Sequence, residues 1–198
     1  MMRPNRGLTL PELLVALAVM AILIAVAAPS FRGMIEVQRL RSINSQLVTD
    51  LQFARNEAAA RGTLLRVVFR FNDNTTCYSL FTSAGSPLVA NSRRCNCLEG
   101  AGNACSGVAG TVEIRTVTVP MSLGVLVFPV EDVAAVAFDP ATGGLVTIPT
   151  DGISLPMNAF KVGTWVDDQR QFYNVLNQSG RPSVCAPAGS TLGGTPCP

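Results

Sequence analysis

Histidine is absent from the 198 residues, and lysine occurs only once, at Lys161. Histidine is the usual base of Ser- and Cys-based catalytic triads, so those triads lack their base in this chain. Only 14% of the residues are charged, and the formal net charge is +2. A nearly neutral chain gives no electrostatic reason to expect nucleic acid binding over a broad surface.

Other catalytic and cofactor motifs are also missing. Two pairs of adjacent carboxylates, Glu131-Asp132 and Asp167-Asp168, make poor acid–base pairs because neighbouring residues on a strand point to opposite faces. No glycine-rich loop follows a strand and opens a helix, as nucleotide binding would require. The sequence therefore predicts a protein that is not an enzyme, with no catalytic residues and no cofactor.

A long hydrophobic run lies near the N-terminus. No ionisable side chain occurs between Leu13 and Phe31. At about 1.5 Å per residue, a helix of this length crosses a hydrocarbon core of about 30 Å. Arg3 and Arg6 precede the run, and this charge bias predicts that the N-terminus stays in the cytoplasm. Glu12 stands at the head of the run, where an unpaired carboxylate is costly in lipid, so it needs a partner.

The sequence Arg-Gly-Leu-Thr-Leu-Pro-Glu at residues 6–12 resembles the N-terminus of a type IV prepilin. In that family a short basic leader ends in glycine, the new terminus is usually phenylalanine, and a glutamate stands at its fifth position. The resemblance implies that a prepilin peptidase cleaves between Gly7 and Leu8 and methylates the Leu8 amine. Leu8 departs from the usual phenylalanine. The resemblance to prepilins also implies assembly with other pilins through the N-terminal helix.

The fifth-position carboxylate has a physical role in such an assembly. Glu12 can pair with the α-ammonium of a neighbouring subunit, which neutralises both charges inside an apolar filament core. Pro11 falls in the first turn of the processed helix, where its missing N–H costs nothing. The alternative is an ordinary signal peptide or signal anchor in which Glu12 is accidental, and the small residues at 25–28 could serve as the cleavage site of such a signal peptide, near Ala28.

The helical pattern continues beyond the hydrophobic run. Apolar residues recur at helical spacing from residue 34 to residue 61, Pro29 is the expected kink, and Gly62 is the expected C-terminal cap. We therefore expect one long helix and one globular domain. The expected parts are a leader (1–7), a transmembrane or filament-core half of the helix (8–31), an amphipathic half (32–62) and a β-rich, disulfide-stapled head (63–198).

The sequence at the end of the helix resembles that of one group within the pilin-like proteins. Residues 51–61, Leu-Gln-Phe-Ala-Arg-Asn-Glu-Ala-Ala-Ala-Arg, resemble the helix end of the GspH/FimT group. This group contains the minor pilins FimT and FimU and the secretion pseudopilin GspH. The alternative is a generic alanine-rich helix whose charges compensate one another at i,i+4 spacing.

Beyond Gly62 the pattern changes to period two and short apolar runs, which are typical of strands. The predicted fold class is α+β: a pilin fold in which the long N-terminal helix packs on an antiparallel β-sheet head. Residues 83–110 are expected to form an exposed loop. The expected strands are 65–71, 77–82, 111–119, 125–128, 133–138, 145–148, 160–166 and 172–176.

The six cysteines are Cys77, Cys95, Cys97, Cys105, Cys185 and Cys197. An exported domain meets an oxidising compartment, so disulfides are expected. A zinc site is not, because the chain has no histidine and no C-x-x-C pair. Cys185 and Cys197 flank a short Gly/Pro-rich tail and are expected to pair. Cys95 and Cys97 are too close to bond each other, so each should pair with Cys77 or Cys105, in an order that the sequence leaves open.

The C-terminal region contains a partial match to a further motif. FimT-type proteins are associated with DNA capture through a Gly-Arg-x-Arg motif, and residues 180–183 here read Gly-Arg-Pro-Ser. Ser183 replaces the second arginine, which removes one phosphate contact. The alternative is a turn with a solvated Arg181. The candidate DNA-binding residues are Arg181, Arg93, Arg94 and Arg170, provided that the disulfides bring them together.

Three functions are compatible with these features. The first is a minor pilin of the type IV pilus that helps to start or cap the filament, at its tip or in its shaft. The second is a pseudopilin of a type II secretion system, and the third is a pilus-borne DNA receptor. The disulfide-rich head and the closing Pro-Cys-Pro at 196–198 favour the first. The expected location is the inner membrane with the head in the periplasm, and the cell-surface pilus after assembly.

Overall fold

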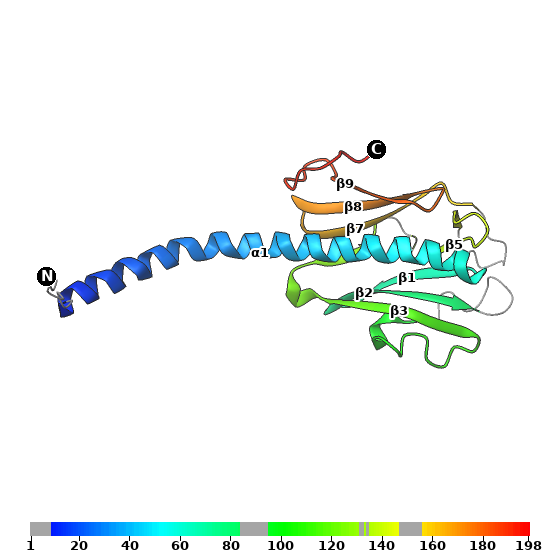
Figure 1. Cartoon of the computed structure of the whole chain (residues 1–198), viewed down its shortest axis with the longest axis horizontal. Coiled ribbons are helices and arrows are strands. Elements are labelled where there is room, and N and C mark those ends of the chain that lie inside the picture. The colour runs from blue at the N-terminus through cyan, green and yellow to red at the C-terminus, as the bar shows by residue number, and fades with distance from the viewer. Residues whose placement is uncertain (1–8, 84–94, 131–132, 134, 147–155) are drawn as a thin grey trace, which may run out of the picture.

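A computed structural model describes residues 9–83, 95–130, 133, 135–146 and 156–198. Helix α1 (Leu10–Arg61) is 52 residues long and continues through Pro29 as a single helix. Its first half projects from the head, whereas its second half lies across the head (Figure 1). The helix ends where Gly62 adopts a left-handed conformation with φ of 62°, which glycine reaches without steric cost.

The head contains two antiparallel sheets, one on each side of the second half of α1 (Figure 1). Two short 3-10 helices, η1 (Cys97–Glu99) and η2 (Met121–Leu123), lie in the connections. This architecture confirms the α+β class and the pilin-type arrangement of a long helix on antiparallel sheet. The five-stranded sheet has the order β3 (Thr111–Pro120), β2 (Thr75–Ser83), β1 (Leu65–Phe71), β5 (Ala135–Phe138), β6 (Leu145–Val146), and the four-stranded sheet has the order β4 (Leu126–Pro129), β7 (Ala159–Asp167), β8 (Arg170–Asn177), β9 (Pro182–Cys185).

The core lies where α1 meets both sheets. Leu47 and Leu51 are fully buried, and the small side chains of Ala54 and Ala58 allow the last turns of the helix to lie close to the strands. The spacing of three and four residues between these positions is the helical stripe seen in the sequence. Opposite the helix, the core is filled from β1, β2, β4, β5, β7 and β8 by Val67, Phe69, Tyr78, Leu80, Val127, Val136, Phe138, Phe160, Val162 and Leu176.

Strand β9 is the element that the sequence analysis does not predict. Its four residues, Pro-Ser-Val-Cys, lack alternating hydrophobicity and begin with a proline. Proline is tolerated because β9 lies at the edge of the four-stranded sheet, where one side of the strand needs no partner. Pairing with β8 and the nearby disulfide of Cys185 therefore form this strand, and its own sequence pattern does not.

A buried carboxylate fixes α1 to the five-stranded sheet. Asp50 is 1% exposed, and its Oδ2 accepts a hydrogen bond from the Tyr78 hydroxyl at 2.7 Å. Its Oδ1 lies 2.6 Å from a guanidinium nitrogen of Arg115 on β3. Because a buried carboxylate is costly unless it is paired, these contacts favour one rotation of the helix about its axis.

A second polar group fixes α1 to the four-stranded sheet. The Oδ1 of Asn44 accepts hydrogen bonds from the hydroxyl of Thr164 on β7 and from the amide of Asn174 on β8, both at 2.8 Å. Nearer the projecting first half of α1, Glu36 forms an ion pair with Arg170 at 2.7 Å. The two sheets are therefore joined to the same helix by polar contacts as well as by the apolar core.

Burial raises the pKa of the Asp50 carboxyl above its usual value, although the Tyr78 hydrogen bond and the Arg115 charge act in the opposite direction. The folded protein then binds this proton more tightly than the unfolded chain does. Its contribution to stability is present below about pH 4 and is lost as the pH rises through the folded-state pKa. We expect the stability difference between wild type and Asp50→Asn to shift against the wild type from about pH 3 to about pH 7, measured by urea unfolding at each pH.

Asp73→Asn, in an exposed turn, is the control for this titration. A difference between wild type and Asp50→Asn that rises with pH would contradict the prediction, because it would mean that the ion pair lowers the folded-state pKa.

Candidate functional site

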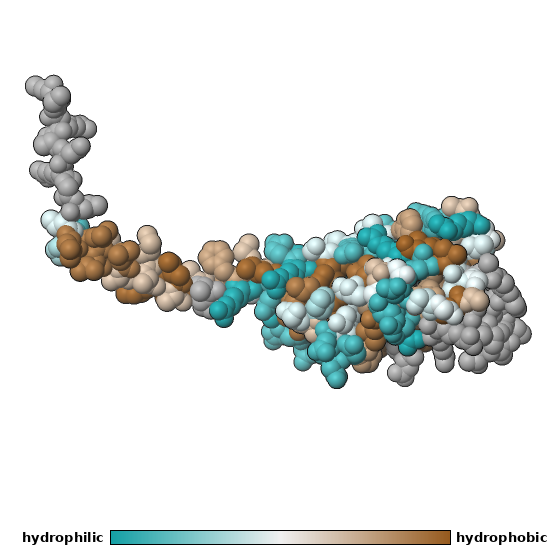
Figure 2. All heavy atoms as spheres, turned by 90° about the horizontal axis from the view of Figure 1, so that it is seen from below, coloured by the Kyte–Doolittle hydropathy of each residue, from teal (hydrophilic) through white to brown (hydrophobic). Residues whose placement is uncertain are grey.

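The first half of α1 is an exposed apolar surface. The segment Leu10–Ala27 is long and apolar enough to cross a membrane, and none of its residues is buried. Figure 2 shows apolar side chains along the part of the helix that projects from the head. A helix that is hydrophobic all round is stable only in lipid or among other apolar helices. This half of α1 is therefore the segment that needs a membrane or neighbouring subunits.

Glu12 lies in the first turn of this apolar segment. Its Oε2 accepts a hydrogen bond of 3.5 Å from the backbone N–H of Thr9, and its side chain is exposed. A carboxylate at this position is favoured by the unpaired N–H groups and the positive end of the helix dipole. Because it forms no ion pair and no hydrogen bond to another side chain in the described part of the chain, the exposed Glu12 carboxylate is accessible to a cation from another molecule. Gly7 and Leu8, the expected cleavage site, lie outside the described residues.

Three disulfides hold the head together, and among the described residues no cysteine is free. The structure decides the pairing that the sequence leaves open. The pairs are Cys77–Cys97, Cys95–Cys105 and Cys185–Cys197. In the described part of the chain, no group of three or more His, Cys, Asp or Glu residues is placed to hold a metal ion.

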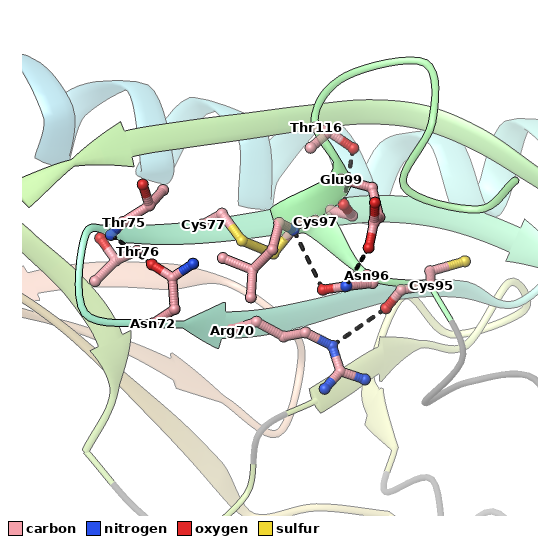
Figure 3. The surroundings of a disulfide bond; sticks show 12 residues. Arg70, Asn72, Thr75, Thr76, Cys77, Cys95, Asn96, Cys97, Glu99 and Thr116 are labelled. Atoms are coloured by element: carbon pink, nitrogen blue, oxygen red, sulfur yellow. Dashed lines mark hydrogen bonds between the residues drawn. A yellow bond between two sulfur atoms is a disulfide. The ribbon is translucent and has the colours of Figure 1, made fainter.

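The Cys77–Cys97 bond fastens residues 95–110, which precede β3, to the face of the five-stranded sheet opposite α1, and the Cys95–Cys105 bond closes this segment on itself. Figure 3 shows Cys77 on β2 bonded to Cys97 on η1, with Arg70 of β1 directing its guanidinium to the carbonyl of Cys95 at 3.4 Å. Cys95 and Cys105 are buried with Val68 and Phe81. The loop therefore covers apolar side chains that would otherwise be exposed on that face.

Arg181 lies at the end of the head that is farthest from the membrane half of α1, after the turn that follows β8. The Asn177 side chain accepts the backbone N–H of Arg181 at 3.1 Å, and the Asn177 carbonyl accepts that of Gly180 at 2.8 Å. Gly180 has a φ of 73°, and a Cβ at this position would lie 2.2 Å from the carbonyl oxygen of Gly143. The turn thus requires glycine, both for its backbone conformation and for its close approach to the loop before β6.

Arg55 is the residue that joins Arg181 at this end of the head. It is half-buried on α1, and its Nε–H donates to the carbonyl of Ser179 at 3.0 Å. Arg55 and Arg181 line a hollow of about 250 Å³ together with Gln52, Asn56 and Pro182. In the sequence, Arg55 stands out only as part of the stretch at 51–61, with no link to Arg181. Nothing in the local sequence signals that the two arginines share a hollow, because 126 positions separate them.

The expected basic patch around Arg181 is not formed with Arg170. Arg170 starts β8, whereas Arg181 follows the far end of that strand, so the two lie roughly 20 Å apart at about 3.3 Å per residue. Arg170 also forms ion pairs of 2.7 Å with Glu36 and with Asp167. The expectation is wrong for this residue because the antiparallel strand places its two ends at opposite ends of the head. Arg93 and Arg94 lie outside the described residues.

Gly180→Ala is expected to destabilise the head more than a substitution that only strains the backbone. Gly124 provides the matched control, because it has the same φ of 73° but open space around the position of a Cβ. We expect Gly180→Ala to lower the free energy of unfolding by about 1 kcal/mol more than Gly124→Ala, since the added methyl group collides with Gly143. Urea unfolding of the two variants measures this difference. Equal losses would show that the approach of the two loops adjusts freely.

Comparison with known proteins supports the interpretation of the N-terminus as a prepilin-type sequence. Residues 2–28 match the family described as "Prokaryotic N-terminal methylation motif". No curated protein and no solved structure matches the chain significantly. The matched segment contains Glu12 and the exposed apolar half of α1, so the motif and the geometry together support a pilin-like protein whose N-terminal helix is suited to membrane anchoring and to assembly. A motif of this kind implies processing by a prepilin peptidase and assembly with other pilins.

Proposed function

We propose that this pilin-like chain is a minor pilin of the type IV pilus, which takes part in pilus biogenesis as a priming, tip or shaft subunit. The observation that carries the proposal is the methylation motif on a fully exposed apolar helix that is continuous with a disulfide-bonded β-sheet head. Residues 1–7 are the leader, 8–31 the membrane or filament-core segment, 32–62 the amphipathic half of the helix and 63–198 the head. The head faces the periplasm before assembly.

The chemistry of assembly follows from the helix. Cleavage between Gly7 and Leu8 frees the amine of Leu8, and Glu12 becomes the fifth residue of the mature chain. Within one subunit, Glu12 already accepts the N–H of Thr9 at the start of the helix. When the apolar half leaves the membrane for a filament, the carboxylate of one subunit and the amine of the next neutralise each other. Neither charge then remains unpaired in an apolar core.

The N-terminus of protein recovered from cells tests this proposal directly. We expect a mature chain that begins with methylated Leu8, and mass spectrometry of the N-terminal peptide measures it. A chain that still begins at Met1 or Met2, or one cleaved near Ala28, would overturn the pilin assignment.

A deletion strain separates the two machines that use such subunits. Loss of surface pili and of twitching motility is the expected result for a minor pilin. Blocked release of exoproteins with intact pili would assign the chain to a type II secretion system as a GspH-type pseudopilin. A role as a DNA receptor has less support in the head, because the charge of Arg170 is neutralised by two carboxylates far from Arg181.

A further inference from the structure

The hollow at the far end of the head has the composition of an anion-binding site. Its described lining contains two guanidinium groups and two side-chain amides but no carboxylate. Gln52 and Asn56 are one helical turn apart on α1, so both amides face the same side as Arg55. Arg181 comes from the other side, at the start of β9.

Arg55 is held in place by the protein while its outer nitrogens stay available. Its Nε–H is bonded to the carbonyl of Ser179, and its guanidinium lies against Gly143, where a Cβ would be 3.1 Å from it. Its Nη atoms make no hydrogen bond to any other described residue. Asp139 Oδ1 accepts the backbone N–H groups of Ala141 and Thr142 and the Thr142 hydroxyl, and no described carboxylate forms an ion pair with Arg55. The fixed guanidinium therefore lacks an anionic partner within the described chain.

An exposed carboxylate lies at the end of the four-stranded sheet that is opposite to the hollow. Asp168 is in the turn between β7 and β8, and its side chain has no partner among the described residues. Asp167 beside it already pairs with Arg170, which in turn reaches Glu36 on α1. Glu36 precedes Arg55 by 19 residues, so this turn lies about 28 Å from the hollow along the helix axis.

We propose that the hollow formed by Arg55 and Arg181 receives the Asp168 carboxylate of a second copy of this chain, displaced by about 28 Å along α1. This contact rests on the proposed function, because it requires subunits whose helices run parallel in one assembly. It is a head-to-tail contact, in which the acceptor and donor surfaces are at opposite ends of one subunit. Such a contact does not close into a symmetric pair, so it is compatible with two copies that lie one above the other in an assembly with other pilins.

The exposed face of α1 supports the same displacement. Between residues 42 and 56 its exposed side chains are uncharged, whereas a helix face that stays in water normally carries charges. With the second copy displaced by 19 residues, its residues 23–37 lie level with this face, and they include exposed Phe31, Met34 and Ile35. The same segment contains the exposed Arg32 and also Glu36, which is paired with Arg170. One displacement thus matches the carboxylate to the arginines and a mostly apolar segment to an uncharged face. The exposed, uncharged residues are Ser42, Ser45, Gln46, Thr49, Gln52, Phe53 and Asn56.

Cross-linking of full-length chains in cells tests the contact. Two differently tagged copies, one with Asn56→Cys and the other with Gln169→Cys, which leaves the Asp168 carboxylate in place, are expressed together and treated with a short thiol-specific cross-linker. We expect a mixed dimer in both the membrane and the sheared pilus fractions, and little product when both copies carry Asn56→Cys. Absence of the mixed dimer from both fractions would overturn the proposal.

Charge reversal shows whether the arginines form the contact. With cysteines at Asn56 and Gln169, Arg181→Glu is expected to lower the yield of mixed dimer at least fivefold, and Asp168→Arg on the second copy is expected to restore it. An unchanged yield in Arg181→Glu would overturn the proposal. A second outcome would also overturn the proposal. If Arg55→Ala loses DNA retention while the yield of cross-linked dimer is undiminished, the hollow is a phosphate site. Recovery of chains with the leader removed in the pilus fraction, but without the mixed dimer, would refute this contact and leave the minor pilin proposal standing.

Discussion

Replacing Glu12 with glutamine is expected to keep the protein in the membrane and to exclude it from filaments. Glutamine preserves the shape of the side chain and still accepts the N–H of Thr9, so the start of α1 is maintained. What the variant loses is the negative charge. In a filament, the amine of a neighbouring subunit would then be buried without a counter-charge.

The expected effect is large because an unpaired buried charge costs about 3–5 kcal/mol. At about 1.4 kcal/mol for each factor of ten, we expect at least a roughly 100-fold lower ratio of filament-bound to membrane-bound protein. Quantitative immunoblotting of the sheared pilus and membrane fractions measures this ratio. Leader removal should remain as in wild type, because the expected cleavage site precedes the substitution, and the N-terminal peptide mass checks it.

Glu57→Gln is the matched control on the same helix. Glu57 forms an i,i+4 ion pair of 2.6 Å with Arg61 near the far end of α1, and the Arg61 side chain is 45% exposed. Exposed pairs of this kind contribute about 0.3–0.5 kcal/mol, so incorporation should remain close to wild type. Equal incorporation of Glu12→Gln and wild type would show that the carboxylate is not the group that pairs in the filament.

Removing the disulfide between Cys77 and Cys97 is expected to produce the largest loss of stability in the head. The bond ties β2 to η1 across 20 residues, and both cysteines are fully buried. Closing a loop of this size is worth about 3 kcal/mol in the chain-entropy description of the unfolded state. The double variant Cys77→Ala/Cys97→Ala is preferable to either single one, because a lone cysteine here would be free to exchange with the Cys95–Cys105 bond.

We expect this double variant to lower the free energy of unfolding by about 3 kcal/mol. Urea unfolding of the full chain in detergent, followed by the fluorescence of the single Trp165, measures the loss. Trp165 is a suitable reporter because it packs edge-on against Phe128, with ring centroids 3.9 Å apart, inside the four-stranded sheet.

Cys185→Ala/Cys197→Ala is the control for this measurement. That bond closes only the C-terminal tail, which follows the edge strand β9. The tail can detach while the sheets stay folded, so local opening limits the loss of global stability. A loss as large as that of the Cys77–Cys97 variant would show that the tail is part of the cooperative unit.

Features that depend on neighbours along the chain are readable from the sequence. The membrane segment follows from an unbroken apolar run, the second half of α1 from helical periodicity, and the end of the helix from Gly62. Most strands also follow from period-two alternation, and β1 spans the expected residues 65–71. These signals suffice for the α+β class and for the position of Glu12, because a helix and a strand are each encoded by spacing within a few turns or residues.

Features that depend on residues far apart in the chain appear only in the tertiary structure. The pairing of Cys77 with Cys97, the division of the strands into two sheets and the edge strand β9 all result from long-range packing. Asp50 looks like a surface charge in the helical pattern, yet Tyr78 and Arg115 of the five-stranded sheet pair with it in the interior. Local sequence carries no information about such partners.

The sequence by itself determined that the chain has a prepilin-like N-terminus, an apolar helix long enough to cross a membrane and a β-rich head. The tertiary structure decided which charges meet. It separated Arg181 from Arg170 by the length of a strand and placed it at the same hollow as Arg55, more than a hundred positions earlier in the chain. The physical reason is that periodicity fixes which face of an element a residue occupies, whereas only the packing of elements fixes what that face contacts.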